Sequence, residues 1–213
     1  MMGEDDADDL SEGSFNSKSV WARMSVVAAG PIFNLILACV FCFILIMITG
    51  YRSPEITGVL DGYSPQEEGL QAGDVITEIN GRNVHIWDDV SLYTMTHADE
   101  APFKVEYERD GKKYTAKLEP RQLEGDAAPL LGVTSGDIVK PGIFKSVEYS
   151  IYKVKYWMNY TVDSLRMLVT GQAGLKDLSG PVGIVNAVDD MYQEAAPAGF
   201  GVVMLSMMNF GVL

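Results

Sequence analysis

One long apolar stretch separates the acidic beginning of the chain from a mixed remainder. The 28 residues between Arg23 and Arg52 carry no charge, and residues 26–49 are almost entirely apolar. A helix of that length measures about 36 Å, enough to cross a hydrocarbon core of ~30 Å. The stretch is too long for the apolar region of a signal peptide, and it follows an acid-rich segment. The pattern therefore predicts a transmembrane helix over residues 25–50.

Residues 54–120 show the short apolar repeats and turn signals of a small β-rich domain. Asn80-Gly81 and Asp110-Gly111 are strong signals for tight hairpin turns. The predicted order is a strand, a short helix, a strand, a hairpin, a helix and a β-hairpin. These elements fall at residues 56–60, 66–69, 75–79, 79–84, 87–96 and 103–118.

Residues 143–170 have the period of an amphipathic helix. Apolar side chains recur every three or four positions, and bases and aromatic rings occupy other positions. This profile is typical of a helix in the membrane interface. A soluble helix that covers the domain is the alternative. The apolar positions are Ile143, Val147, Ile151, Val154, Met158, Val162, Leu165 and Val169.

The segments between and after these blocks are less regular. Residues 121–142 form either a polar linker or a closing strand of the domain. Residues 171–198 predict a loop and a short helix. Residues 199–213 carry no charge and are interpreted as the truncated start of a further transmembrane helix.

Composition excludes several classes of protein. The 213 residues carry a net charge of −13, whereas nucleic-acid binding needs a basic face. Two cysteines are too few for a disulfide scaffold, and 47% hydrophobic residues exclude disorder of the whole chain. The predicted class is an α+β membrane protein with a transmembrane helix, a β-rich domain, an interfacial helix and the start of another span. Membrane lipid is an expected partner and nucleic acid is not.

One string in the β-rich block resembles the signature of a bacterial PDZ domain. It runs from Ser64-Pro65 through Gly69-Leu70-Gln71-Ala72-Gly73-Asp74-Val75-Ile76 to Ile79-Asn80-Gly81. Such domains bind extended peptides by adding a strand to an open sheet edge. The resemblance implies a PDZ-like, peptide-binding domain over residues 54–120. In a permuted PDZ domain, Leu131, Gly132 and Val133 would form the peptide-carboxylate loop and edge strand, unless they form a closing strand.

The flanks of this domain resemble RseP-type site-2 intramembrane zinc metalloproteases. Residues 14–23 and Ala29-Gly30-Pro31-Ile32-Phe33-Asn34 resemble the approach to the second core helix of that family. Leu178-Ser179-Gly180-Pro181-Val182-Gly183-Ile184 resembles the loop before the next core helix. The resemblance implies that Gly30, Pro31 and Asn34 lie on a core helix near the active site, where small residues let another helix approach.

The zinc ligands of that family have no match in this sequence. The family holds zinc with an HExxH helix and the aspartate of a Leu-Asp-Gly motif, and neither string occurs here. His85 and His97 are interpreted as surface or edge histidines. We therefore expect zinc in the complete enzyme, no catalytic or metal-ligating residue in this chain, and no activity of the isolated chain.

Two functions fit these features. The first is the substrate-gating and membrane-core portion of a site-2 protease, acting on single-pass membrane proteins in regulated intramembrane proteolysis. The alternative is a non-catalytic, membrane-tethered PDZ module that binds peptides. The flanking coding sequence distinguishes them, since the first requires the two zinc-binding strings.

The bases beside the apolar stretch predict its orientation. Lys18 and Arg23 precede the stretch and only Arg52 follows closely, so residues 1–24 should form an acidic cytoplasmic segment. The PDZ-like domain should then lie outside the cytoplasm of a multi-pass cell-membrane protein. With both native cysteines replaced by alanine, a single Asp110→Cys should react with a membrane-impermeant thiol reagent in intact cells. Labelling only after the cells are opened would show that the PDZ-like domain lies in the cytoplasm, opposite to this prediction.

Overall fold

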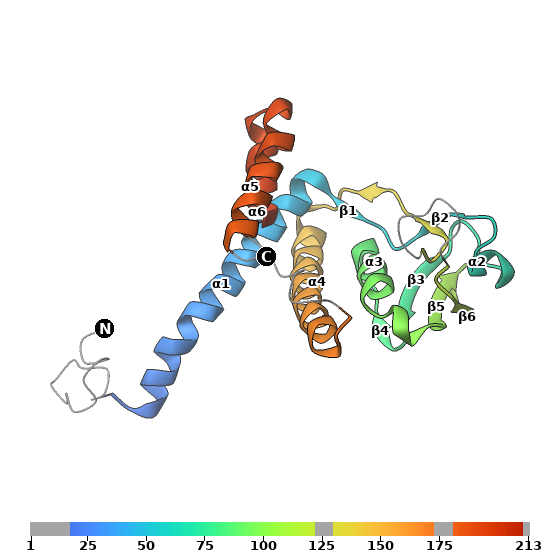
Figure 1. Cartoon of the computed structure of the whole chain (residues 1–213), viewed down its shortest axis with the longest axis horizontal. Coiled ribbons are helices and arrows are strands. Elements are labelled where there is room, and N and C mark those ends of the chain that lie inside the picture. The colour runs from blue at the N-terminus through green and yellow to red at the C-terminus, as the bar shows by residue number, and fades with distance from the viewer. Residues whose placement is uncertain (1–17, 122–129, 173–180, 211–213) are drawn as a thin grey trace. The chain divides into compact units, whose positions relative to one another are not determined.

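The structure is a computed structural model that describes residues 18–121, 130–172 and 181–210, without the side chains of 181–187 and 210. The predictions for most of residues 1–24, for 178–180 and for 211–213 fall outside these ranges. The chain divides into two compact units, residues 1–40 and 41–213, which are described separately. The predicted mixture of helices and antiparallel strands is present (Figure 1).

Helix α1 (Val20–Thr49) contains the predicted apolar stretch. Its first turn is capped by Ser19, whose Oγ accepts a hydrogen bond from the Ala22 N–H at 3.3 Å. The helix continues through Pro31. Among the described helices, α1 is the one long and apolar enough to cross a membrane, by length and composition.

A four-stranded antiparallel sheet forms the centre of the second unit, with strand order β4-β3-β5-β6. The bounds are β3 (Val75–Ile79), β4 (Arg82–Asn83), β5 (Phe103–Arg109) and β6 (Lys112–Leu118). Both predicted hairpin turns have positive φ angles at their central residues, 46° and 85° at Asn80-Gly81 and 51° and 74° at Asp110-Gly111. These angles suit the tight turns that join twisted strands.

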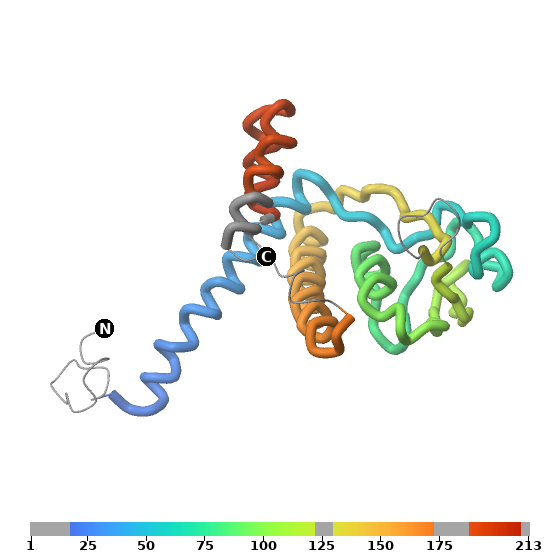
Figure 2. Tube along the Cα trace, viewed as in Figure 1, coloured from blue at the N-terminus to red at the C-terminus, as the bar shows by residue number. Residues whose placement is uncertain are grey.

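Two further strand pairs connect the sheet to the helices. Strand β2 (Ile56–Val59) pairs with β7 (Val133–Ser135), and β1 (Tyr51–Arg52) pairs with β8 (Ile138–Val139), both antiparallel. The chain therefore leaves α1 and returns towards α4 along neighbouring paths (Figure 2). For residues 121–142 the alternatives were a polar linker and a closing strand. The described part of this segment forms strands β7 and β8.

The domain core lies between the sheet and helix α3 (Trp87–Thr96), whose bounds match the prediction. Helix α2 (Ser64–Glu67) is a single turn that begins two residues before the predicted 66–69, with Pro65 in its first turn. Leu131 also belongs to the core, so the residues that close the domain extend beyond 120. The buried cluster consists of Ile56, Leu70, Ile76, Ile79, Val84, Val90, Tyr93, Phe103, Val105, Tyr107, Ala116, Leu118 and Leu131.

Helix α4 (Ile143–Thr170) follows the domain and presents its polar side to it. The buried positions of α4 are Ser146, Ser150, Val154 and Asp163, three of which are polar. The predicted apolar positions other than Val154 are exposed, from 50% at Val147 to 87% at Val169. Helix α4 thus covers part of the domain with its polar side and leaves its apolar stripe exposed.

Three more helices follow. Helix α5 (Pro181–Ala195), the 3-10 turn η4 (Ala196–Ala198) and helix α6 (Phe200–Phe210) fall in the regions where a short helix and an uncharged helix are predicted. With 11 residues, α6 is shorter than the roughly 20 that a membrane span needs.

An ion pair joins Asp74, directly before β3, to Arg109 at the end of β5. Arg109 donates to both carboxylate oxygens of Asp74, at 2.6 and 2.7 Å, and the Gln71 N–H donates to Asp74 Oδ2 at 2.8 Å. Burial alone would raise the pKa of Asp74, but the hydrogen bonds and the charge of Arg109 lower it. The folded state therefore favours the ionised carboxylate.

We predict that Asp74→Asn lowers the free energy of unfolding by roughly 2–3 kcal/mol, because Arg109 loses its ionic partner. Since folding lowers the pKa of Asp74, the stabilisation is complete above the ordinary carboxyl pKa of about 3.9 and is lost as pH falls through the folded value. Urea unfolding of both proteins between pH 7 and pH 3 measures this. A stability difference that stays constant over that range would contradict the assignment.

Candidate functional site

The loop before β7 is held by a glycine that lies directly against a tyrosine ring. Gly132 has a φ angle of +82°, and a Cβ at this position would collide with the Tyr63 side chain. The Gly132 carbonyl accepts a hydrogen bond from the Leu60 N–H at 2.9 Å. Leu131 is buried in the core, with 6% of its surface exposed. The three predicted residues Leu131, Gly132 and Val133 are thus fixed between α2 and β2.

The outer edge of β7 carries backbone groups that are available for another strand. Hydrogen-bonded and non-hydrogen-bonded pairs alternate along an antiparallel ladder. Because Leu60 bonds to Gly132, the next pair, Val59 and Val133, should direct its N–H and C=O groups away from each other. Within the described residues, β7 pairs with β2 alone. Val133 therefore presents its backbone to the open edge.

The loop also offers donors for a negative group. Among the described residues, the N–H groups of Leu131 and Gly132 have no hydrogen-bond acceptor. Successive N–H groups at a residue with positive φ form a concave site that suits a carboxylate. Arg121 lies nearby, bridged to Leu130, and its guanidinium bonds to Glu67 at 2.8 Å and lowers the pKa of that carboxyl. The arrangement offers backbone groups for an added strand and N–H donors for an anion.

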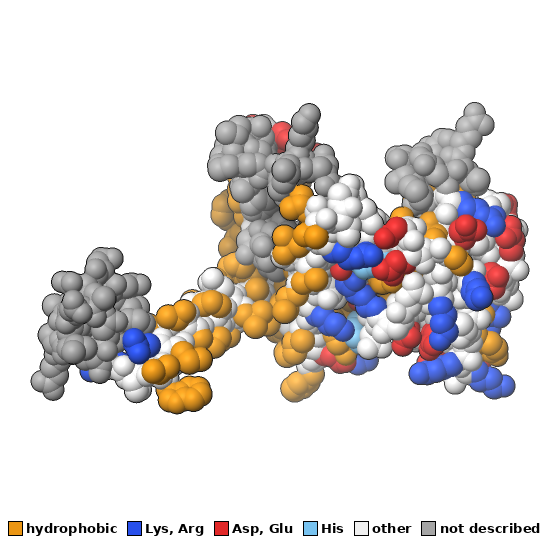
Figure 3. Space-filling model, turned by 60° about the horizontal axis from the view of Figure 1, so that its bottom comes forward, with side chains coloured by type: hydrophobic (Ala, Val, Ile, Leu, Met, Phe, Trp, Pro, Cys, Tyr) orange, Lys and Arg blue, Asp and Glu red, His pale blue; other side chains and the backbone are white. Residues whose placement is uncertain are grey.

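The predicted core-helix residues lie in the first unit. Gly30, Pro31 and Asn34 are exposed on α1, and a Cβ at Gly30 would meet no described atom within 4 Å. Apolar side chains extend along α1 beside them (Figure 3). The role of these three residues next to an active site stays a prediction.

The two histidines occupy different environments, and the prediction of a surface or edge position is wrong for His97. His97 is buried, with 8% exposure, because it caps the end of α3 beneath residues of α4. His85 is half-buried and stacks on Tyr152, with ring centroids 3.9 Å apart. Among the described residues, no three His, Cys, Asp or Glu side chains gather as a metal site would require.

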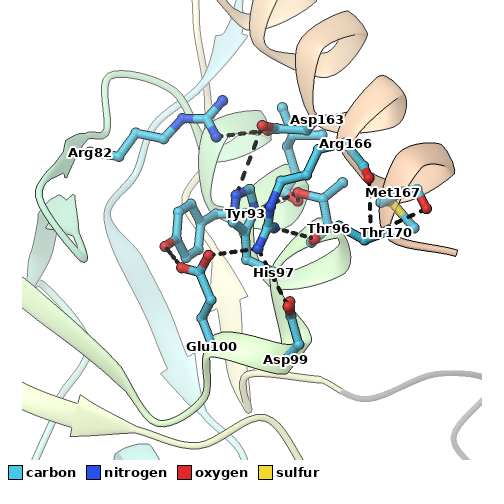
Figure 4. A network of polar contacts seen from close by, with 11 residues as sticks. Arg82, Tyr93, Thr96, His97, Asp99, Glu100, Asp163, Arg166, Met167 and Thr170 are labelled. Carbon is cyan, nitrogen blue, oxygen red and sulfur yellow. Dashed lines mark hydrogen bonds and ion pairs between the residues drawn. The ribbon is translucent and has the colours of Figure 1, made fainter. Parts of the chain in front are cut away.

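The structure also shows a polar seam between α3 and α4 that sequence analysis missed. Asp163 and Arg166 of α4 contact residues of β4, α3 and η2 (Ala98–Glu100) (Figure 4). Arg82 and Asp163 are 81 positions apart, so no local pattern could have paired them. The one local signal was that the charged side chains Asp163 and Arg166 lie three positions apart on α4.

Comparison with known proteins matches the whole chain. The sequence profile of peptidase family M50 covers residues 1–213. A putative zinc metalloprotease of Clostridium acetobutylicum is 35% identical over 99% of the chain and 59% of its own length. Regulator of sigma-W protease RasP of Bacillus subtilis is 31% identical over 93% of the chain and 48% of its own length. The chain thus spans about half the length of these relatives.

Among solved structures, the PDZ domain of an SdrC-like protein from Listeria monocytogenes is similar to part of the chain. It covers 41% of this chain and 87% of its own length, with 22% identity and a TM-score of 0.29. A similarity this low adds no support to the fold described above.

Gly132→Ala tests the loop geometry. We predict that it lowers the free energy of unfolding by about 2–4 kcal/mol, because positive φ costs roughly 1–2 kcal/mol and the collision with Tyr63 adds a similar amount. Gly81→Ala is the matched control, since Gly81 has a φ of +85° and open space around a Cβ. Chemical unfolding of both variants gives the difference. Equal losses would show that Tyr63 does not confine the loop.

Proposed function

Because the chain belongs to peptidase family M50, we propose that it serves zinc-dependent proteolysis within the membrane, and that its domain selects substrates. The match over residues 1–213 is the observation that carries this proposal. The relatives bear the names of a zinc metalloprotease and of a regulator of sigma-W protease, which supports a regulatory protease as the whole protein. Its substrates would be single-pass membrane proteins.

Zinc in the whole protein is proposed from the names of the relatives. The described histidines, His85 and His97, are committed to a ring stack and to a hydrogen bond with Thr96. They therefore receive no role in metal binding, and no catalytic step is assigned to this chain. Its contribution is to anchor the protein in the membrane, to orient the domain and to select substrates.

The surface of α4 supports a place at the membrane boundary. Its exposed stripe is apolar, while its domain-facing side is polar. The helix begins beside the end of α1, where Ser146 Oγ lies 3.1 Å from Met47 Sδ and Tyr149 stacks on Tyr51 at 3.6 Å. If α1 spans the membrane, this position lies near the surface, where an apolar stripe with aromatic rings favours lipid.

The domain itself supports recognition of extended chain ends. Its element order agrees with the resemblance to a permuted PDZ domain, in which β7 is the edge strand and Leu131 and Gly132 form the carboxylate loop. A peptide that adds to β7 would bond through its backbone, so the site would select an exposed, unfolded end. Membrane proteins that have lost a folded outer domain would present such an end.

The alternative function, a tethered PDZ module without catalysis, needs the same domain and the same anchor. The family match favours the protease, because it includes the predicted core-helix residues and not only the domain. No observation specific to the described residues favours the alternative.

Peptide binding tests the proposed edge. Fluorescent octapeptides with an apolar last residue and a free carboxylate should bind the detergent-solubilised chain at least about tenfold more tightly than the same peptides with an amide end, since hydrogen bonds to charged groups are worth about 1.5–3 kcal/mol. Val133→Pro removes the edge N–H and should abolish binding, whereas Val133→Ala keeps it. Equal binding of amide and carboxylate, or undiminished binding by Val133→Pro, would contradict the proposed site.

A further inference from the structure

A cavity lies where the end of α1 meets α4 and α6 (Figure 1). Its volume is about 620 Å³, within the range of about 300–1,000 Å³ that is usual for small-ligand sites. All of its lining residues belong to the second unit, residues 41–213. Apolar side chains come from α1, β8 and α6, and charged side chains come from β1, α3 and α4. The cavity therefore suits a molecule with one polar and one apolar end.

The charged part of the lining has one excess positive charge. Arg52 and Lys153 are its bases, and Asp88 is its acid. Lys153 Nζ lies 3.3 Å from Asp88 Oδ1, and an ammonium group carries three N–H donors, so donors remain for another acceptor. Although the chain has a net charge of −13, the Arg52 side chain forms no hydrogen bond or ion pair with any described residue. The cavity thus offers two cationic groups to an anion.

The apolar part of the lining lies beside these bases. Ile138 is directly opposite Arg52 in the pair of β1 and β8, so the two side chains share one face of the ladder. Ile138 is 60% exposed, and Leu45, Ile46 and Leu205 continue the apolar surface along α1 and α6. A free inorganic anion would leave this surface uncovered. An anion that carries hydrocarbon chains would contact both parts of the lining.

The place of the cavity along the chain indicates where such a ligand would come from. Helix α1 ends at Thr49, and Arg52 is the first charged residue after its apolar stretch. Bases at the end of a spanning helix lie at the level of the lipid head groups. This step rests on the proposed placement of α1 across the membrane. Lipid phosphates would then be the most abundant anions within reach of Arg52.

We propose that the cavity binds the phosphate group of an anionic phospholipid, whose acyl chains lie against Ile138 and the end of α1. Phosphatidylglycerol carries one negative charge and so balances the one excess positive charge of the lining. Phosphatidylcholine has no net charge and gains less from the two bases. Basic pockets beside membrane helices bind anionic head groups in the same way. The bound lipid would contact both β1 and α4, and so fix the height of the domain above the membrane.

Lipid titration tests the site on the full chain in a non-ionic detergent. Phosphatidylglycerol with a fluorescent acyl chain should bind about fivefold more tightly than phosphatidylcholine with the same chains, because one base near a lipid surface favours an anionic lipid by about that factor. Inorganic phosphate, even in excess, should not displace the lipid. Equal binding of the two lipids would overturn the proposal. Displacement by phosphate would show a site for a free anion instead.

Three variants locate the binding in the cavity. Arg52→Gln should weaken phosphatidylglycerol binding about fivefold, and Asp88→Asn should tighten it by a similar factor, because it removes the acid of the lining. Lys155→Gln is the matched control, since Lys155 is an exposed base of α4 that does not line the cavity. It should bind like the parent. Unchanged binding by Arg52→Gln, or equal weakening by Lys155→Gln, would overturn the site.

Vesicle flotation separates this inference from the proposed function. If α1 spans the membrane, the chain should float with phosphatidylcholine vesicles, whether or not the cavity holds an anionic lipid. A chain that floats but shows no preference for phosphatidylglycerol contradicts the cavity site alone. A chain that does not float contradicts the membrane placement and the lipid site together.

Discussion

The contact between α3 and α4 is made through charges and aromatic rings, and this determines what the rest of the helix can face. Asp163, Arg166 and Lys153 all point to the domain and find opposite charges there. The apolar residues of α4 are consequently left on the outer side, where the described chain does not cover them. An exposed apolar stripe of this length is costly in water, which supports the proposed place of α4 at the membrane boundary.

The domain combines contacts between neighbouring parts of the chain with contacts between distant parts. Its four-stranded sheet is built from two local hairpins, whereas the pair of β2 and β7 closes it across more than 70 residues. Leu131 contributes to the core from this distant segment, and Gly132 allows the backbone to pass against Tyr63. The strand that closes the core is therefore the strand whose other edge stays open, which ties the integrity of the proposed binding edge to the stability of the domain.

Local signals predicted local structure well. Asn80-Gly81 and Asp110-Gly111 needed only their own backbone preferences to define two hairpins, and the bounds of α3 followed from its periodicity. Long-range contacts had no such signal. The sequence left the segment around Leu131 as either a linker or a strand, and it indicated a surface or edge position for His97. His97 is buried because Asp163 and Arg166 approach it from about 70 residues away.

The amphipathic pattern of α4 could not by itself say which side meets the domain, because either face of such a helix can be buried. Desolvation decides between them once lipid is admitted as a partner. Placing Asp163 and Arg166 against the domain costs desolvation that Arg82 and Glu100 offset by direct pairing. Turning the same charges towards hydrocarbon would offer no partner and would cost several kcal/mol for each. If α4 lies at a membrane surface, as proposed, it places Asp163 and Arg166 against protein and leaves its apolar side outward, opposite to the arrangement that water alone would favour.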